Sequence, residues 1–162
     1  MNKLNLIEKK IVSVDDLKRN LAIWNFQGKK VVFTNGCFDL IHRGHIEFIS
    51  QAANQGDVLI VALHSDASVA RLKGEGRPIQ DAVTRALILC SLLWVDAVVM
   101  IDEDLPLELI SIVKPDVLVK GADQLPKDIV GYDVVSAKQG RVITIDMVKG
   151  QSTDLLLERI RS

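Results

Sequence analysis

The chain has 162 residues, of which 48% are hydrophobic and 25% are charged, a length and composition typical of one globular domain with a substantial core. Its 20 Lys and Arg residues nearly balance 21 Asp and Glu residues, which excludes the net positive field that holds nucleic acid or an anionic membrane. No apolar run is long enough to span a bilayer. We therefore expect small-molecule partners, with local basic clusters binding phosphate compounds.

The cysteines and the start of the chain predict a cellular compartment. Cys37 and Cys90 lie far apart without any paired spacing, and no charged-then-apolar leader is visible. This pattern predicts reduced cysteines, no disulfide and a cytoplasmic location. Basic neighbours would lower the pKa of Cys37, but without a base or a resolving cysteine we interpret it as a small packing residue.

In chain order, the first predicted element is a helix over residues 13–24. Ser13 is its expected N-cap, Asp16 completes a capping-box pattern, and Leu17 and Leu21 fall on one apolar face. We interpret residues 1–28 as a helical prefix to a main domain over residues 29–162.

The rest of the chain alternates between apolar strands and amphipathic helices. Strands are expected at 29–36, 57–63, 96–101, 115–121 and 141–146, and helices at 44–56, 81–94, 105–113, 127–137 and 152–160. The second strand, DVLIVAL, is apolar on both faces, which is typical of a central parallel strand covered by helices on both sides. The predicted fold is α/β, Rossmann-like and doubly wound, with about five parallel strands and helices on both faces.

Polar clusters follow every predicted strand. They occur at 34–39, 64–68, 101–106, 120–124 and 147–153. Ligands of open parallel sheets bind outside the carboxyl ends of the strands, so these clusters predict the active face.

Two of the three histidines, His42 and His45, stand at the expected start of the helix after the first strand. Unpaired amides at a helix start attract anions, and two imidazoles there would donate to phosphate oxygens and help neutralise a triphosphate. Gly44 would let the backbone come close. The alternative is that both histidines are surface or N-capping residues. The case for a zinc site is weaker still, because the i, i+4 spacing of zinc-binding histidines and a third nearby ligand are missing.

The stretch TNGCFDLIHRGH, residues 34–45, resembles the signature of the cytidylyltransferase-like nucleotidyltransferases. The segments HSDASVARLKGEGRPI, TRALILCSLLWVDAVV, PDVLVKGAD and GQST follow in order, so the resemblance covers about residues 28–160. Within this superfamily the chain is most similar to adenylyltransferases that form ADP-heptose. The resemblance implies transfer of AMP from ATP, with Mg²⁺, to heptose 1-phosphate, with release of pyrophosphate, in a homodimer that feeds lipopolysaccharide or another surface glycan.

The reaction of this family needs no protein nucleophile, because the substrate phosphate itself attacks the α-phosphorus. A phosphate monoester has its second pKa near 6, so its oxygen is already ionised at neutral pH. Catalysis then consists of holding two anions together and stabilising the equatorial oxygens. The resemblance gives this role to His42, His45 and Lys73, with Mg²⁺ held mainly by the triphosphate.

The resemblance also implies binding residues. For the nucleotide these are Thr34, Asn35, Gly36, Cys37, Phe38, Gly44, Lys120, Gly121, Asp123, Gly150, Ser152 and Thr153, and for the substrate Asp39, Asp66, Arg77 and Arg85. Ser152 and Thr153 could instead be simple N-cap residues. Asp39 could anchor the loop, Asp66 could cap a helix starting at Ala67, and Arg85 could be an ordinary exposed helix residue.

Four positions depart from the family pattern. His64 stands where asparagine is common, Leu105 replaces a threonine, Gln124 replaces a tyrosine, and Asp154 replaces a hydroxyl residue. None falls on the histidine motif or the loop lysine. Two other functions fit the same residues: a cytidylyltransferase acting on glycerol phosphate or a similar alcohol phosphate, and a nucleotide-binding module without turnover. Spacing alone does not separate ATP from CTP.

Overall fold

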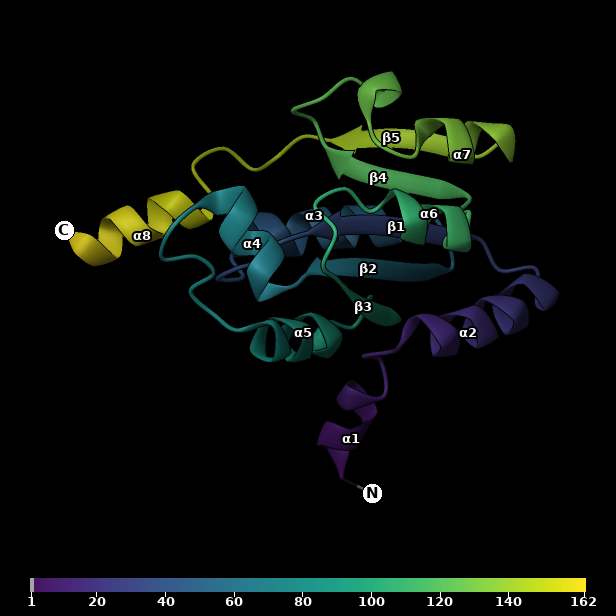
Figure 1. The fold of residues 1–162 in the computed structure, drawn as a ribbon, viewed down its shortest axis with the longest axis horizontal. Helices are drawn as coiled ribbons and strands as arrows, with labels where there is room; N and C mark the ends of the chain where they lie inside the picture. The colour runs from purple at the N-terminus through teal and green to yellow at the C-terminus, as the bar shows by residue number, and fades with distance from the viewer. Residues whose placement is uncertain (1) are drawn as a thin grey trace.

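A computed structural model describes residues 2–162 and contains one five-stranded, all-parallel sheet with strand order β3-β2-β1-β4-β5 (Figure 1). The strands are β1 (Val31–Gly36), β2 (Val58–His64), β3 (Ala97–Ile101), β4 (Val117–Gly121) and β5 (Arg141–Ile145). The helices are α1 (Lys3–Glu8), α2 (Val14–Phe26), α3 (Arg43–Ala53), α4 (Asp66–Lys73), α5 (Ala82–Ser91), α6 (Leu107–Val113), the 3₁₀ turn η1 (Pro126–Asp128), α7 (Tyr132–Ala137) and α8 (Thr153–Arg161). The predicted α/β, doubly wound fold class is confirmed.

Two apolar clusters cover the two faces of the sheet. Val31 and Phe33 of β1 point into a cluster with α2, α6 and α7, whereas Val32 points into a cluster with α3 and α5. Every residue of β2 is buried, as its continuous apolar run predicts for a central parallel strand. No helix within residues 2–162 is long and apolar enough to cross a membrane.

The observed elements differ from the predicted ones mainly at their ends. The helix expected over 81–94 ends at Ser91, and the one expected near 127–137 is divided into η1 and α7. Apolar periodicity does not reveal α4, because its only buried residues are Ser68 and Val69. Short helices with little buried surface carry a weak pattern.

The segment before β1 packs closely on the sheet. Ser13 caps α2 as predicted, and Leu17 and Leu21 of that helix lie in the core. Ahead of α2, Ile11 forms a parallel bridge with Val98 at the outer edge of β3. Residues 11–21 therefore share the core of the sheet, and a domain boundary at residue 28 stays a prediction.

This packing can be tested on α2. Leu17→Ala removes a fully buried side chain and should lower the free energy of unfolding by about 2–5 kcal/mol in denaturant titrations. Ile23→Ala, on the same helix but 54% exposed, should change it by no more than about 0.5 kcal/mol. Equal effects of the two substitutions would mean that α2 is not part of the sheet's core.

Candidate functional site

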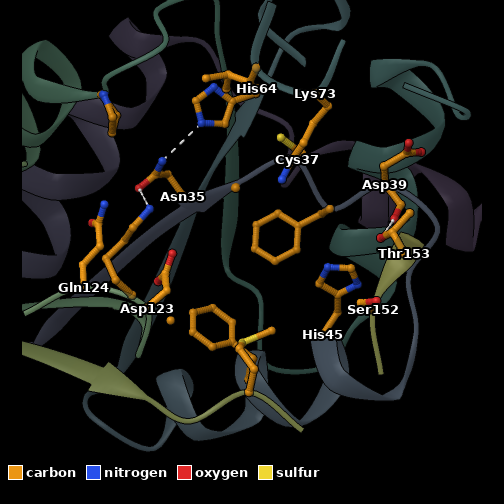
Figure 2. A pocket seen from close by; sticks show the side chains of 18 of the residues that line it. Asn35, Cys37, Asp39, His45, His64, Lys73, Asp123, Gln124, Ser152 and Thr153 are labelled. Atoms are coloured by element: carbon orange, nitrogen blue, oxygen red, sulfur yellow. Dashed lines mark hydrogen bonds between the residues drawn. The ribbon is translucent and has the colours of Figure 1, made fainter. Parts of the chain in front are cut away.

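A cleft of about 690 Å³ lies at the carboxyl ends of the strands, around the point between β1 and β4 where the strand order reverses (Figure 2). This is where ligands bind in open parallel sheets. The residues predicted for the site that line the cleft are Asn35, Gly36, Cys37, Phe38, Asp39, His42, His45, Lys73, Arg77, Lys120, Gly121, Asp123, Ser152 and Thr153. Segments from both ends of the sheet domain thus meet in one cavity.

The two cleft histidines cap the first turn of α3. His42 is the N-cap residue, and its Nδ1 accepts the Gly44 amide at 3.1 Å. In return, Nδ1 of His45 accepts the amide of His42 at 3.4 Å, and the two ring centroids are 3.9 Å apart. N-capping and a functional role are therefore compatible, because capping uses one nitrogen of each ring and leaves Nε2 free.

Gly44 is required by this capping arrangement and not by direct contact with the cleft. A Cβ at this position would stand 3.0 Å from both Cε1 and Nδ1 of His42, closer than nearly all real contacts. A larger residue would push the His42 ring off the amide it accepts. Gly44 is buried and does not line the cleft, unlike the expectation from the sequence.

The loop between β1 and α3 brings an aromatic ring against His45. Phe38 has a left-handed backbone with φ of 46°, and its ring centroid lies 5.4 Å from that of His45. A Cβ on Gly36 would meet the Phe38 ring at 2.9 Å, so a side chain there would displace the ring. Gly36 thus leaves room for the Phe38 ring, and this ring shields one side of His45 from water.

Burial keeps both imidazoles uncharged. It lowers the pKa of His45 to about 4, with a further lowering by His42, and it also lowers the pKa of His42. Because each Nδ1 accepts a backbone amide, the proton of each neutral ring is on Nε2. The pair therefore forms two neutral N–H donors, and its role toward a triphosphate stays a prediction.

Asp39 anchors the loop that follows α4. Burial alone would raise its pKa, but hydrogen bonds from the amides of Ile79 (2.8 Å) and Gln80 (3.0 Å) and from Arg77 (3.0 Å) bring the net pKa below its ordinary value. Arg77 also lies 3.1 Å from Asp154, so the acidic departure at position 154 has a cationic partner. These contacts match the alternative in which Asp39 anchors the loop.

Arg85 and Asp66 occupy different places from those expected. Arg85 is fully buried, and its guanidinium donates to the carbonyls of Cys37 (2.6 Å) and Gln80 (2.9 Å) and to Asp66 (2.7 Å). Neither charged residue lines the cleft. With one bond from each guanidinium nitrogen, Arg85 ties together the loops at Cys37, Gln80 and Asp66 behind the cleft, and a substrate-binding role for Arg85 stays a prediction.

Two nucleotide-binding candidates also lie outside the cleft. The Thr34 hydroxyl is buried and donates to the Val119 carbonyl at 2.9 Å, which ties β1 to β4 at the reversal point. Gly150 belongs to the turn between β5 and α8 and does not line the cavity. Both act on the shape of the site and not on its surface.

The start of α8 closes one side of the cleft. Ser152 is the N-cap and accepts the amide of Leu155 at 3.2 Å, while the Thr153 hydroxyl donates to the Asp39 carbonyl at 2.8 Å (Figure 2). Both residues line the cavity while making these bonds. The capping alternative therefore describes their present contacts, and a phosphate-binding role stays a prediction.

Lys120, at the end of β4, supplies a half-buried cation. Its Nζ donates to Asn35 Oδ1 at 3.1 Å; burial lowers its pKa, and the nearby Asp123 and Cys37 partly oppose that lowering. The Cys37 pKa is raised, because burial outweighs the opposing Lys73 and arginine charges. The expected positive neighbours are present and do act to lower the Cys37 pKa, but burial outweighs them, so the net pKa is raised.

Sequence reasoning did not assign several cleft residues. They are Phe48, His64, Leu72, Asp104, Leu105, Pro106, Gln124, Asp128, Ile129, Val130, Met147, Gln151 and Asp154. Met147 and Gln151 lie inside a polar cluster already singled out, so that cluster was a usable signal. Ile129 and Val130 follow η1, and no motif marks them. Within residues 2–162, no three His, Cys, Asp or Glu side chains are grouped to hold a metal ion.

Residues 33–154 match the model of the cytidylyltransferase-like family. The chain belongs to this family. The resemblance noted from the sequence is thereby confirmed, and with it a place among the nucleotidyltransferases, whose substrates include a nucleotide.

Proteins named bifunctional protein HldE are similar to most of the chain. The one from Azorhizobium caulinodans is 51% identical over 152 residues, and the one from Campylobacter jejuni is 53% identical over 154 residues. These alignments cover 94% and 95% of this chain but 32% of each relative, so the chain spans about a third of their length.

Solved structures show the same fold. The lipopolysaccharide core biosynthesis protein from Thermoplasma volcanium superposes with a TM-score of 0.60 at 28% identity, covering 76% of this chain and all of the other. The pantoate-beta-alanine ligase from Francisella tularensis has a TM-score of 0.58 at 18% identity, covering 86% of this chain and 67% of the other. The second likeness concerns the fold alone.

The lowered His45 pKa gives a prediction for acid stability. In the unfolded chain the His45 ring is protonated near pH 6.5, whereas in the folded protein it is protonated only near pH 4. The contribution of His45 to stability is therefore complete above pH 6.5 and is lost as the pH falls toward 4. His45→Asn keeps an acceptor for the His42 amide but does not titrate there.

Denaturant unfolding at several pH values measures this difference. The free energy of unfolding of the unmodified protein should fall more steeply between pH 6.5 and 4 than that of His45→Asn. Parallel curves for the two proteins would show that His45 titrates normally in the folded state.

Proposed function

We propose that this domain is an adenylyltransferase that transfers AMP from ATP to heptose 1-phosphate, forming ADP-heptose and pyrophosphate. The proposal rests on one observation, the pair of Nε2–H donors of His42 and His45 at the N-terminus of α3. Lys73 and Lys120 line the same cleft. Family membership supports the reaction class. The sequence resemblance to ADP-heptose-forming enzymes and the likeness to a lipopolysaccharide core biosynthesis protein support the acceptor.

In the proposed reaction, an oxygen of the sugar phosphate attacks the α-phosphorus, a new P–O bond forms, and the bond to the β-phosphate breaks to release pyrophosphate. The attacking oxygen is ionised at neutral pH, so no residue has to remove a proton. Charge grows on the oxygens around the α-phosphorus and on the leaving group. Neutral donors fixed at 3.9 Å centroid separation meet this charge without reorganising.

The cations of the cleft complement these neutral donors. Lys73 ends α4, is exposed, and makes no ion pair within residues 2–162, so it is free to approach the triphosphate. Lys120 and Asp123 at the end of β4 border the space proposed for the nucleoside. Mg²⁺ enters as part of the substrate, bound to the triphosphate oxygens.

The proposal includes a cytoplasmic homodimer. Cys37 and Cys90 are both free thiols, which fits a reducing compartment. The homodimer is carried over from the family resemblance alone.

Pyrophosphate release tests the reaction and its substrates together. The protein is incubated with ATP or CTP and with heptose 1-phosphate, glycerol phosphate or other sugar phosphates, each with Mg²⁺. We expect release with ATP and heptose 1-phosphate. Release only with CTP and glycerol phosphate would instead identify a cytidylyltransferase, and nucleotide binding without release in any mixture would identify a module without turnover.

His45 substitutions test the donor role. His45→Ala should lower turnover by about 100- to 1,000-fold, since one donor to the developing charge is lost. His45→Asn retains an acceptor for the His42 amide but has no N–H at the Nε2 position, so it should be nearly as slow while α3 stays capped. Circular dichroism and thermal unfolding check the fold. Near-normal turnover of His45→Asn would remove Nε2 from the mechanism.

A further inference from the structure

A continuous chain of hydrogen bonds runs along the wall of the cleft from Lys120 to Asp104 and passes through the buried Ser68 of α4. Lys120 Nζ contacts Asn35 Oδ1 at 3.1 Å, and Asn35 Nδ2 contacts His64 Nε2 at 3.2 Å (Figure 2). On its other side, His64 Nδ1 lies 3.0 Å from Ser68 Oγ, which lies 3.1 Å from Asp104 Oδ1. The chain thus joins β4, β1, β2 and α4 with the loop after β3.

Only one set of donor directions satisfies every contact in this chain when His64 is neutral. The Lys120 ammonium only donates, so it must meet the Asn35 oxygen, and the Asn35 amide nitrogen then donates to Nε2 of His64. The His64 proton is therefore on Nδ1 and is donated to Ser68. The Ser68 hydroxyl in turn donates to Asp104. His42 and His45 have the opposite tautomer, with the proton on Nε2.

His64 is held neutral by its surroundings. It is 3% exposed, and burial lowers its pKa, as do the positive charges of Lys120 on β4 and Arg85 on α5. The Asp104 carboxylate and the Glu103 backbone carbonyl, both from the loop after β3, act in the opposite direction but do not prevail. Protonation would place an Nε2–H against the Asn35 amide nitrogen, which is itself a donor and cannot accept it.

We propose that His64 is a positioning residue: neutral His64 holds the Asn35 amide in the orientation that fixes Lys120 in the cleft. Protonated His64 releases the Asn35 amide and thereby weakens nucleotide binding. The proposal rests on the proposed function, because it takes Lys120 to face the bound nucleotide. His64 itself touches no substrate in this scheme.

The imidazole suits this position because its two nitrogens point in opposite directions. One nitrogen reaches Asn35 on β1 and the other reaches Ser68 on α4. His64 therefore links Lys120, through Asn35, to the helix that ends at Lys73.

The tautomer can be measured without any ligand. The chain has three histidines, so long-range ¹H–¹⁵N correlation spectra of the full protein at pH 8 resolve each ring. We expect His64 to carry its proton on Nδ1, and His42 and His45 to carry theirs on Nε2. A His64 proton on Nε2 would break the chain at Asn35 and overturn the proposal.

Nucleotide affinity tests the consequence. ATP dissociation constants are measured by calorimetry between pH 8 and pH 5 for the unmodified protein, His64→Gln and His64→Ala. A glutamine amide oxygen can replace Nε2 as acceptor at every pH, whereas alanine offers none. The ratio of the unmodified protein's dissociation constant to that of His64→Gln cancels the titrations of ATP and of the other two histidines.

We expect this ratio to stay near one at pH 8 and to rise about 10-fold as the pH falls below 6.5, with His64→Ala weakened at every pH. A ratio that stays flat, in variants with unchanged thermal unfolding at pH 8, would contradict the positioning role. If the unmodified protein binds no ATP at any pH, the proposed function fails instead. The tautomer measurement separates the two outcomes, because it uses no nucleotide.

Discussion

At the first turn of α3, the Nδ1 atoms of His42 and His45 each accept a backbone amide, and the properties of the cleft depend on this pair of bonds. They fix both rings, assign each proton to Nε2 and direct two N–H donors toward the cavity. Gly44 leaves the space that the His42 ring needs. Phe38 covers His45 and helps to keep it uncharged. A helix cap thereby forms a fixed pair of hydrogen-bond donors, and in the proposed reaction this pair would stabilise developing charge without the cost of reorganisation.

Charge in the cleft is separated from this donor pair and belongs to side chains that differ in exposure. Lys120 is half-buried at a strand end and is bonded to Asn35, whereas Lys73 ends a short helix and is exposed. Arg77 is held between two carboxylates, one of them the buried Asp39. In the proposed reaction between two anions, the fixed groups would orient the anions and the exposed lysine would approach after they bind. Arg85 supports the arrangement from behind the cleft.

The sequence predicted those features that depend on neighbouring residues. The alternation of apolar strands with amphipathic helices revealed the sheet and its active edge. The spacing of His42 and His45 placed both rings at the start of one helix. Features that depend on distant residues were not visible. Nothing local shows that Arg85 turns inward, because two of its partners, the Cys37 carbonyl and the Asp66 carboxylate, are distant in sequence and only the fold brings them near. The same holds for His64, whose role depends on its contact with Asn35 of the adjacent strand.

The most direct test of the central claim is a crystal structure of the protein with a non-hydrolysable ATP analogue. The account predicts that phosphate oxygens lie about 3 Å from Nε2 of both His42 and His45, while each Nδ1 still accepts its backbone amide. Phosphates bound away from both rings, or a transition metal coordinated between the two Nε2 atoms, would contradict it.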